Sequence, residues 1–239
     1  MTIINAVVQV RMGSQRFPGK TLKRIQSFSC LELLAKRISK SKLLNNTIVA
    51  TSTLPRDAEI VSECKKLGLD YYIGEEQDVH GRLSLCLKDN PCEFFLRITG
   101  DDILLDQEII DFFCKKLLKE KPDFISSFDS KSFPNGFVLS GFRTDFFLST
   151  NEEYLSRFDR EHVIPFYLKN KNSMKFLSIK AKKKWEGYGL NFAIDNSQDL
   201  DRLEMLTDID LLDSSSSYII SQVKKDKGLT KLFSANAEY

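Results

Sequence analysis

The 239-residue sequence is poor in the side chains from which zinc sites and disulfide frameworks are built. It contains two histidines and five cysteines, and no pair of cysteines has C-x-x-C spacing. Zinc sites need closely spaced His and Cys ligands, so none is expected. An odd number of scattered cysteines instead predicts reduced, partly buried thiols in a cytoplasmic protein.

An excess of charge of one sign is also missing. The chain has 35 basic and 33 acidic residues, which gives a formal net charge of +2. Proteins that bind nucleic acid usually show a strong basic excess, so no nucleic-acid partner is expected. The local enrichment in lysine at 180–184 is more typical of a solvated turn than of a binding patch.

Long apolar runs are absent as well. No stretch approaches the roughly 20 apolar residues that are needed to cross a bilayer. The first residues, MTIINAVVQVR, have no basic n-region and are interrupted by Asn5 and Gln9. We therefore expect no signal peptide, no membrane partner and a cytoplasmic location.

A phosphate-binding P-loop is absent too, although the stretch GSQRFPGKT resembles one. A P-loop has four residues between its first glycine and its Gly-Lys pair, whereas five residues separate Gly13 from Gly19. Pro18 also lacks the backbone N–H that a phosphate cradle uses. The stretch nevertheless places three basic residues around a glycine-containing loop directly after an apolar run.

The first half of the sequence shows a regular alternation of strands and helices. Runs rich in β-branched and aromatic residues alternate with segments whose apolar residues recur at helical spacing. This order predicts an α/β fold with a mostly parallel central sheet, covered on both faces and joined by right-handed connections. The expected strands are 4–10, 46–52, 70–74, 93–99 and 123–128, and the expected helices are 31–40, 55–68, 78–89 and 106–121.

From about residue 129 this alternation breaks down. Asn135–Gly136 reads as a turn between two strands, and a later apolar run returns to a buried strand that ends in an aspartate. No internal repeat or domain boundary interrupts residues 1–239, so a single domain is expected. The elements expected here are strands within 133–142 and at 190–195, and helices at 160–170, 197–207 and 215–226.

Charged side chains follow several of the expected strands. Ligands of open α/β sheets bind at the carboxyl ends of the strands. Basic residues and Ser14 follow the first strand, Asp101 and Asp102 follow the strand at 93–99, and Asp195 follows the strand at 190–195. Taken alone, the basic loop is more typical of a solvated loop, and the two aspartate segments are equally consistent with helix caps. Their convergence on one sheet edge favours a site for a polyphosphate and a hard cation such as Mg²⁺.

Five segments carry a resemblance to a known family. VQVRMGSQRFPGKTL (8–22) resembles the opening signature of the cytidylyltransferases that activate sugars. The other segments are similar to the subgroup of spore-coat polysaccharide biosynthesis cytidylyltransferases, which are relatives of the CMP-Kdo and CMP-acylneuraminate synthetases. These segments are YIGEEQDVHGRL (72–83), LRITGDDILLD (96–106), REHVIPFY (160–167) and NFAIDNSQDL (191–200).

The resemblance implies a Rossmann-like nucleotidyltransferase fold of the glycosyltransferase-A type, with a small dimerisation and acceptor extension at 133–170. The implied reaction transfers CMP from CTP to a sugar hydroxyl, foremost that of a sugar acid, with Mg²⁺ and release of pyrophosphate. Such a reaction serves surface polysaccharide or glycan biosynthesis. The alternatives are a phosphorylated or phosphonate acceptor that gives a CDP-type product, another nucleotide base, or a non-catalytic nucleotide-binding homologue.

The resemblance also implies the site residues, by position. Arg16 and Lys20 would hold the β- and γ-phosphates and act in catalysis together with Asp101. Asp101 and Asp195 would bind the metal. The implied nucleotide-binding residues are Val10, Arg11, Gly13, Ser14, Asp78, Arg82, Thr99 and Gly100, and the implied acceptor-binding residues are Arg160, Glu161 and His162.

The segment 133–170 bears on the acceptor and on the oligomeric state. Many relatives carry acidic residues where this sequence has Val138 and Ser140, which affects the acceptor more than the nucleotide. Aromatic side chains in the segment predict an exposed patch and hence a homodimer interface, and the alternative is a local cap on the same core. These aromatic residues are Phe133, Phe137, Phe142, Phe158, Phe166 and Tyr167.

Overall fold

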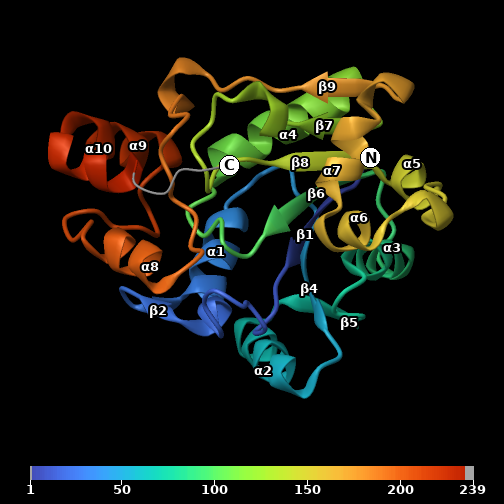
Figure 1. Cartoon of the computed structure of the whole chain (residues 1–239), viewed down its shortest axis with the longest axis horizontal. Helices are drawn as coiled ribbons and strands as arrows, with labels where there is room; N and C mark the ends of the chain where they lie inside the picture. Colours follow the sequence, from blue (N-terminus) through green and yellow to red (C-terminus); the bar gives the residue numbers. More distant parts are fainter. Residues whose placement is uncertain (1, 235–239) are drawn as a thin grey trace.

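A computed structural model describes residues 2–234 and shows a seven-stranded sheet with helices on both faces (Figure 1). In spatial order the strands are β5 (Asp70–Gly74), β4 (Asn46–Ser52), β1 (Ile4–Gln9), β6 (Phe94–Thr99), β8 (Ser140–Arg143), β7 (Phe124–Ser126) and β9 (Phe176–Ser178). β8 runs antiparallel to both of its neighbours, whereas the other neighbouring strands are parallel. The predicted α/β fold with a mostly parallel sheet is confirmed.

Two buried clusters lie on opposite faces of this sheet, because alternate residues of a strand point to opposite sides. In β6, Leu96 and Ile98 belong to one cluster and Phe95 to the other. The first cluster includes residues of α1 (Cys30–Ile38), α2 (Ala58–Leu67), α4 (Gln107–Glu120), α8 (Ser197–Glu204), α9 (Ser216–Lys225) and α10 (Lys227–Ser234). The second includes residues of α3 (Val79–Asp89), α5 (Thr144–Leu148) and α7 (Ile164–Lys169). A small hairpin of β2 (Arg24–Ile25) and β3 (Phe28–Ser29) contributes the buried Ile25 to the first cluster, whereas no residue of α6 (Arg157–His162) belongs to either cluster.

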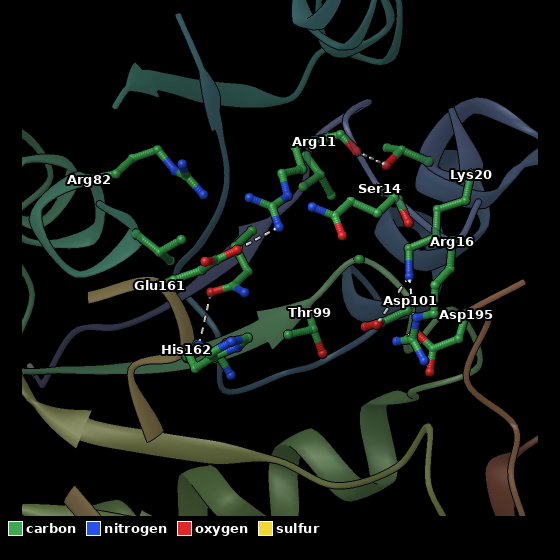
Figure 2. A pocket seen from close by; sticks show the side chains of 17 residues that line it. Arg11, Ser14, Arg16, Lys20, Arg82, Thr99, Asp101, Glu161, His162 and Asp195 are labelled. Atoms are coloured by element: carbon green, nitrogen blue, oxygen red, sulfur yellow. Dashed lines mark hydrogen bonds and ion pairs between the residues drawn. The ribbon is translucent and has the colours of Figure 1, made fainter. Parts of the chain in front are cut away.

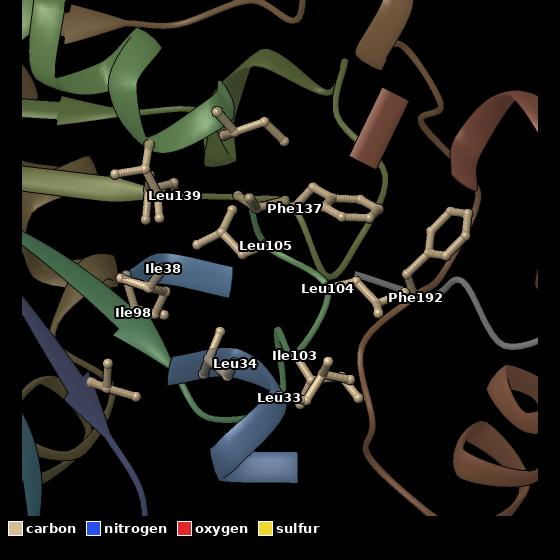
Figure 3. Packing of buried hydrophobic residues seen from close by; sticks show 14 of the residues in the cluster. Leu33, Leu34, Ile38, Ile98, Ile103, Leu104, Leu105, Phe137, Leu139 and Phe192 are labelled. Atoms are coloured by element: carbon tan, nitrogen blue, oxygen red, sulfur yellow. The ribbon is translucent and has the colours of Figure 1, made fainter. Parts of the chain in front are cut away.

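The larger cluster is built where α1 covers the sheet. Leu34 and Ile38 of α1 gather with Ile98 of β6 and with Leu105 of the loop that follows it (Figure 3). All four side chains are buried. Each contributes roughly 1.5–3 kcal/mol relative to an exposed position, so the packing fixes the carboxyl end of β6.

Arg37 of α1 is buried within the same region and satisfies main-chain carbonyls. It donates hydrogen bonds to Leu104 at 2.7 and 3.1 Å and to Ser214 at 2.8 Å, and it also reaches Leu211. Burial lowers its pKa to about 10. Because Leu104 lies in the loop after β6, this arginine holds that loop against the start of α9.

The predicted strand at 190–195 is wrong. This segment pairs with the chain through an isolated bridge between Asn135 and Asn191. Directly after the bridge, Gly136 adopts a φ of 91°, which turns the partner segment away before a ladder can form. Within the predicted strand pair at 133–142, only β8 forms, starting at Ser140.

The predicted helix at 160–170 is in fact two helices. α6 ends at His162 and α7 begins at Ile164, because Val163 between them has φ 63° and ψ −65°. A β-branched residue rarely adopts a positive φ, so the sequence gives no sign of the break. Val163 is fully buried, and its core packing holds this conformation.

The aromatic argument for a dimer interface is wrong. Phe133, Phe137, Phe142 and Tyr167 are at most 1% exposed and belong to the core. Of the six aromatic residues in question, Phe158 is the one that is largely exposed, at 58%. The alternative, a cap on the same core, accounts for the other residues, and the homodimer itself stays a prediction.

The cysteines are free thiols, and all but Cys92 are buried. Burial raises the pKa of Cys30, Cys86 and Cys114 to about 12, so these thiols are uncharged near neutral pH. The prediction of partly buried thiols is therefore confirmed. None of the helices between residues 2 and 234 combines the length and the apolar character that a membrane crossing requires.

Candidate active site

The site begins in the loop that leaves β1. The carboxylate of Asp57, buried at the start of α2, accepts a hydrogen bond from the backbone N–H of Met12 at 2.8 Å. Gly19 closes the loop by donating its N–H to the Met12 carbonyl at 2.9 Å, and its φ of 74° is one that glycine adopts readily. The 3₁₀ turn Lys20–Leu22 follows at once. The backbone that carries Lys20 is therefore fixed on both sides.

Lys20 lies between two carboxylates that come from distant parts of the chain. Its Nζ is 3.3 Å from Asp101 Oδ2 and 3.5 Å from Asp195 Oδ1, and it donates a hydrogen bond to the Ile194 carbonyl at 2.7 Å. Arg16 approaches Asp195 from the solvent side at 2.8 Å. The two carboxylates are therefore no further apart than one ammonium group can span. Between residues 2 and 234 no third His, Cys, Asp or Glu side chain joins them in a metal-binding group.

A cavity of about 610 Å³ opens between this loop, the end of β6 and α6 (Figure 2). Cationic side chains line it on both sides of the two carboxylates, which makes it suited to a ligand with several negative charges. Most of the predicted site residues line this cavity. They are Val10, Arg11, Ser14, Arg16, Lys20, Arg82, Thr99, Gly100, Asp101, Glu161, His162 and Asp195.

The far wall of the cavity holds an ion pair between Arg11 and Glu161, whose Nη2 and Oε1 atoms are 2.9 Å apart. The hydrogen bond from Arg11 lowers the pKa of Glu161, so this carboxylate is charged. Arg82 lies nearby and donates to the carbonyl of Glu75 at 2.6 Å. Burial lowers the pKa of Arg82. This wall links the loop after β1 to α6.

Three predicted site residues line neither this cavity nor the one described next. Asp78 caps α3 by accepting a hydrogen bond from the backbone N–H of Gly81 at 2.8 Å, and it pairs with Arg160 at 2.9 Å. This pair joins α3 to α6, so in this structure both residues support the wall. Gly13 lies against Arg56, where an added Cβ would collide with the guanidinium.

A second cavity, of about 340 Å³, adjoins the first and shares part of its lining with it. The shared residues are Arg97, Thr99, Asp101, His162 and Asp195. Apolar side chains form much of the remaining wall, including Phe128, Val138 and Phe158. The junction of the two cavities therefore lies beside the carboxylates that Lys20 spans.

Sequence reasoning missed Arg97, a buried arginine that lines both cavities. Arg97 lies within β6 and donates from Nε to Gln9 Oε1 at 2.9 Å. Asp102 accepts a hydrogen bond from the Thr99 hydroxyl at 2.5 Å. Burial, and then the charge of Asp101, raise the pKa of Asp102. A charged residue within an otherwise apolar strand run was the available signal for Arg97.

Comparison with known sequences gives one family and several relatives. The sequence model of the family described as cytidylyltransferase matches residues 5–227. Uncharacterized protein MJ1063 of Methanocaldococcus jannaschii is 31% identical over 224 residues, which cover 93% of this chain and 91% of that protein. Spore coat polysaccharide biosynthesis protein SpsF of Bacillus subtilis is 32% identical over 46% of this chain and 48% of its own. A 3-deoxy-manno-octulosonate cytidylyltransferase of Bdellovibrio bacteriovorus is 32% identical over 45% of this chain and 43% of its own.

Two solved structures share the fold. A cytidylyltransferase from Leptospira borgpetersenii serovar Hardjo-bovis superposes with a TM-score of 0.90 at 22% identity, over 100% of both chains. CMP:2-keto-3-deoxy-manno-octonic acid synthetase in complex with CTP superposes with a TM-score of 0.65 at 14% identity, over 87% of this chain and 99% of that one. The predicted Rossmann-like fold is therefore confirmed.

Proposed function

Because the chain belongs to the cytidylyltransferase family, and is thus a CTP-using nucleotidyltransferase, we propose that it transfers CMP from CTP to a sugar hydroxyl and releases pyrophosphate. The observation that carries this proposal is Lys20 between Asp101 and Asp195, at the place where the two cavities meet. A phosphate-binding cation, a pair of carboxylates and space for two substrates coincide there. The larger cavity would take CTP and the smaller one the acceptor.

The triphosphate would bind to the loop after β1. Arg16 and Lys20 are four residues apart and both reach Asp195, so their charges lie together at one end of the larger cavity. On binding CTP, these cations would exchange the carboxylates for the β- and γ-phosphates. Phosphoryl transfer depends mainly on positioning and on charge stabilisation of the leaving group, which these two residues supply.

Asp101 and Asp195 fit a divalent cation such as Mg²⁺. They are partly exposed carboxylates from separate segments, and a single amine already spans them. Mg²⁺ is usually held by one or two carboxylates together with substrate phosphates. When bound it would neutralise phosphate charge and favour the departure of pyrophosphate.

The nucleoside and the acceptor would occupy the two cavities that meet beside Asp101 and Asp195. Val10, Arg11, Ser14 and Gly100 line the larger cavity alone, and we assign them with Arg82 to the nucleotide. His162 and Thr99 line both cavities, so they lie where the acceptor hydroxyl would meet the α-phosphate. Arg160, Glu161 and His162 would hold the acceptor, with Arg160 acting through its pair with Asp78.

The acceptor class is tested by measuring pyrophosphate release from CTP with sugar acids, sugar phosphates, phosphonates and polyol phosphates. We propose a sugar acid, and a role in surface polysaccharide or glycan biosynthesis, with the phosphorylated or phosphonate acceptor as the alternative. CTP should be preferred over ATP, GTP and UTP. Tight CTP binding without release from any acceptor would instead identify a non-catalytic nucleotide-binding homologue.

We further propose a cytoplasmic homodimer, with part of the segment 133–170 at the interface. The support is the family resemblance together with two exposed aromatic residues in this segment, Tyr154 at 75% and Phe158 at 58% exposure. Apolar side chains gathered at the surface often mark contacts. Light scattering at micromolar concentration tests the dimer, and a monomer there would contradict it.

A further inference from the structure

Arg97 is a cation in a strand whose other residues are mostly apolar, and it lines both cavities while only 7% exposed. We propose that Arg97 binds an oxyanion of the acceptor, so that the acceptor carries a carboxylate or a phosphate group. This inference rests on the proposed function and adds to it the specificity-determining residue and the charge of the second substrate.

The first support is that most of the hydrogen-bonding capacity of Arg97 is unused. A guanidinium carries donors on Nε and on both Nη atoms, and here only Nε donates, to Gln9. Among residues 2–234, neither Nη of Arg97 has a protein partner and no carboxylate oxygen lies within 4.0 Å. Arg37, by contrast, uses both Nη atoms on main-chain carbonyls. The Nη atoms of Arg97 are not among the fully buried polar atoms that lack a partner, so they open into the cavities, where a ligand can pair with them.

The second support is the neutral surface that faces Arg97 from the neighbouring strand. Ser140 of β8 lies directly opposite Arg97 in the β6–β8 register, and its buried Oγ has no partner in the described chain. Val138, two residues earlier, lines the smaller cavity with an apolar side chain. The adjoining strand therefore supplies no anion for the guanidinium.

The third support is the lining of the smaller cavity. Among the described residues that line it, Arg97 is the one arginine or lysine, and it lies beside three aspartates, Asp101, Asp102 and Asp195. The other walls of the smaller cavity include Phe158, Ile164 and Pro165. A volume of about 340 Å³ lies at the small end of the range for ligand pockets. An anionic group of the acceptor would therefore have to meet Arg97, while the apolar walls suit the rest of a compact acceptor.

The experiment compares the wild type with Arg97→Gln and Arg97→Lys, and Arg143→Gln serves as the control. Arg143 lies at the end of β8, pairs with Asp123 and Asp145, and lines neither cavity. We expect Arg97→Gln to raise the KM for the acceptor about 10- to 100-fold, the scale of charge-assisted hydrogen bonds. The KM for CTP should stay within about threefold of the wild-type value. The KM of Arg97→Lys for the acceptor should lie between the values of the wild type and Arg97→Gln. Arg143→Gln should leave both KM values unchanged.

A panel of acceptors tests whether the acceptor must be anionic and whether its anionic group is a carboxylate or a phosphate. Sugar acids and sugar phosphates are compared with the corresponding neutral sugars, and the wild type should discriminate against the neutral compounds while Arg97→Gln should not. If neutral sugars serve the wild type equally well, the inference fails and the proposed function stands. If instead the KM for CTP rises in Arg97→Gln, the arginine serves the nucleotide and the inference is also refuted.

A binding measurement does not depend on turnover. Inorganic phosphate is titrated into the CTP-saturated protein by calorimetry, so that the triphosphate positions are already filled. The wild type should bind phosphate, and Arg97→Gln should bind it at least about tenfold more weakly. Equal binding by both proteins, or no binding by the wild type, would overturn the inference. Failure of the proposed function appears separately, as an absence of pyrophosphate release by the wild type.

Discussion

The ammonium group of Lys20 lies between Asp101 and Asp195, the two carboxylates that we assign to a divalent cation. Removal of this group should therefore strengthen cation binding and slow turnover. The substitution Lys20→Met removes the ammonium and keeps an unbranched chain of similar length. We expect Mn²⁺ to bind about tenfold more tightly in the absence of CTP, because the resident counter-charge of Asp101 and Asp195 has gone. We expect kcat/KM for pyrophosphate release to fall about 10²-fold or more, because the departing pyrophosphate loses a charged partner.

The magnitude follows from the distances around the ammonium. Its Nζ is 3.3 Å from Asp101 and 3.5 Å from Asp195, so a cation held by both carboxylates would lie about 4 Å from it. A divalent ion and a unit charge at this distance repel by about 2 kcal/mol even at the dielectric constant of water. Screening by salt and movement of the lysine side chain reduce this repulsion to about 1.4 kcal/mol, which corresponds to a tenfold change in the affinity for Mn²⁺.

The assay is a calorimetric Mn²⁺ titration together with steady-state pyrophosphate release. Thr21→Val is the matched control, since Thr21 is adjacent, buried and uncharged, and its hydroxyl donates to the Arg11 carbonyl at 3.3 Å. It should leave Mn²⁺ affinity unchanged and keep kcat/KM within roughly threefold, about 0.7 kcal/mol. An inactive Thr21→Val beside an active Lys20→Met would refute the reasoning, as would Mn²⁺ binding that weakens in Lys20→Met.

Three further predictions concern single residues. Asp101→Asn should abolish pyrophosphate release while the melting temperature stays within a few degrees, and residual turnover above about 1% of wild type would argue against its role at the metal. Arg37→Met should lower the free energy of unfolding in urea by about 3–5 kcal/mol, because buried carbonyls lose their donor; a loss below about 1 kcal/mol would show that water replaces it. His80 is buried, which lowers its pKa from 6.5 to about 4, so the unfolded chain takes up a proton first and stability falls as the pH drops from about 6.5 towards 4. Between pH 7 and pH 5 the wild type should lose about 2 kcal/mol more than His80→Gln in urea unfolding, and identical losses would contradict a buried neutral histidine.

The strands of the parallel half could be predicted because they are buried on both faces. β1 and β6 read as mostly apolar runs and β4 has an apolar centre at 48–50, a pattern that is typical of parallel strands. The position of the site followed from the same pattern, because the carboxyl ends of parallel strands meet at one edge. This argument brings Lys20 and Asp101 together without knowledge of any distance, whereas Asp195 was placed there by the family resemblance and by a predicted strand at 190–195 that does not form.

What could not be predicted depends on contacts between distant segments. The segment at 190–195 has the composition of a strand, but its partner turns away at Gly136 after a single bridge. The aromatic residues around 133–142 are apolar whether they face a partner or the core, so composition cannot separate the two. Arg97 is visible as a charge in an apolar run, but the fact that Gln9 engages only its Nε is a property of the folded sheet.

Because of the conformation of Val163, the free energy needed to order the backbone next to the site is spent when the chain folds, and not when the substrate binds. A buried β-branched residue at φ 63° costs on the order of 1–3 kcal/mol, which the surrounding core must offset when the chain folds. Glu161 and His162 precede it and face the larger cavity, so their backbone is already ordered before an acceptor arrives. The acceptor then loses less affinity to the ordering of its site. Affinity for the acceptor is thus linked to the packing of residues such as Phe147 and Tyr167, which line neither cavity, and loosening that packing would weaken binding without removing any contact to the ligand.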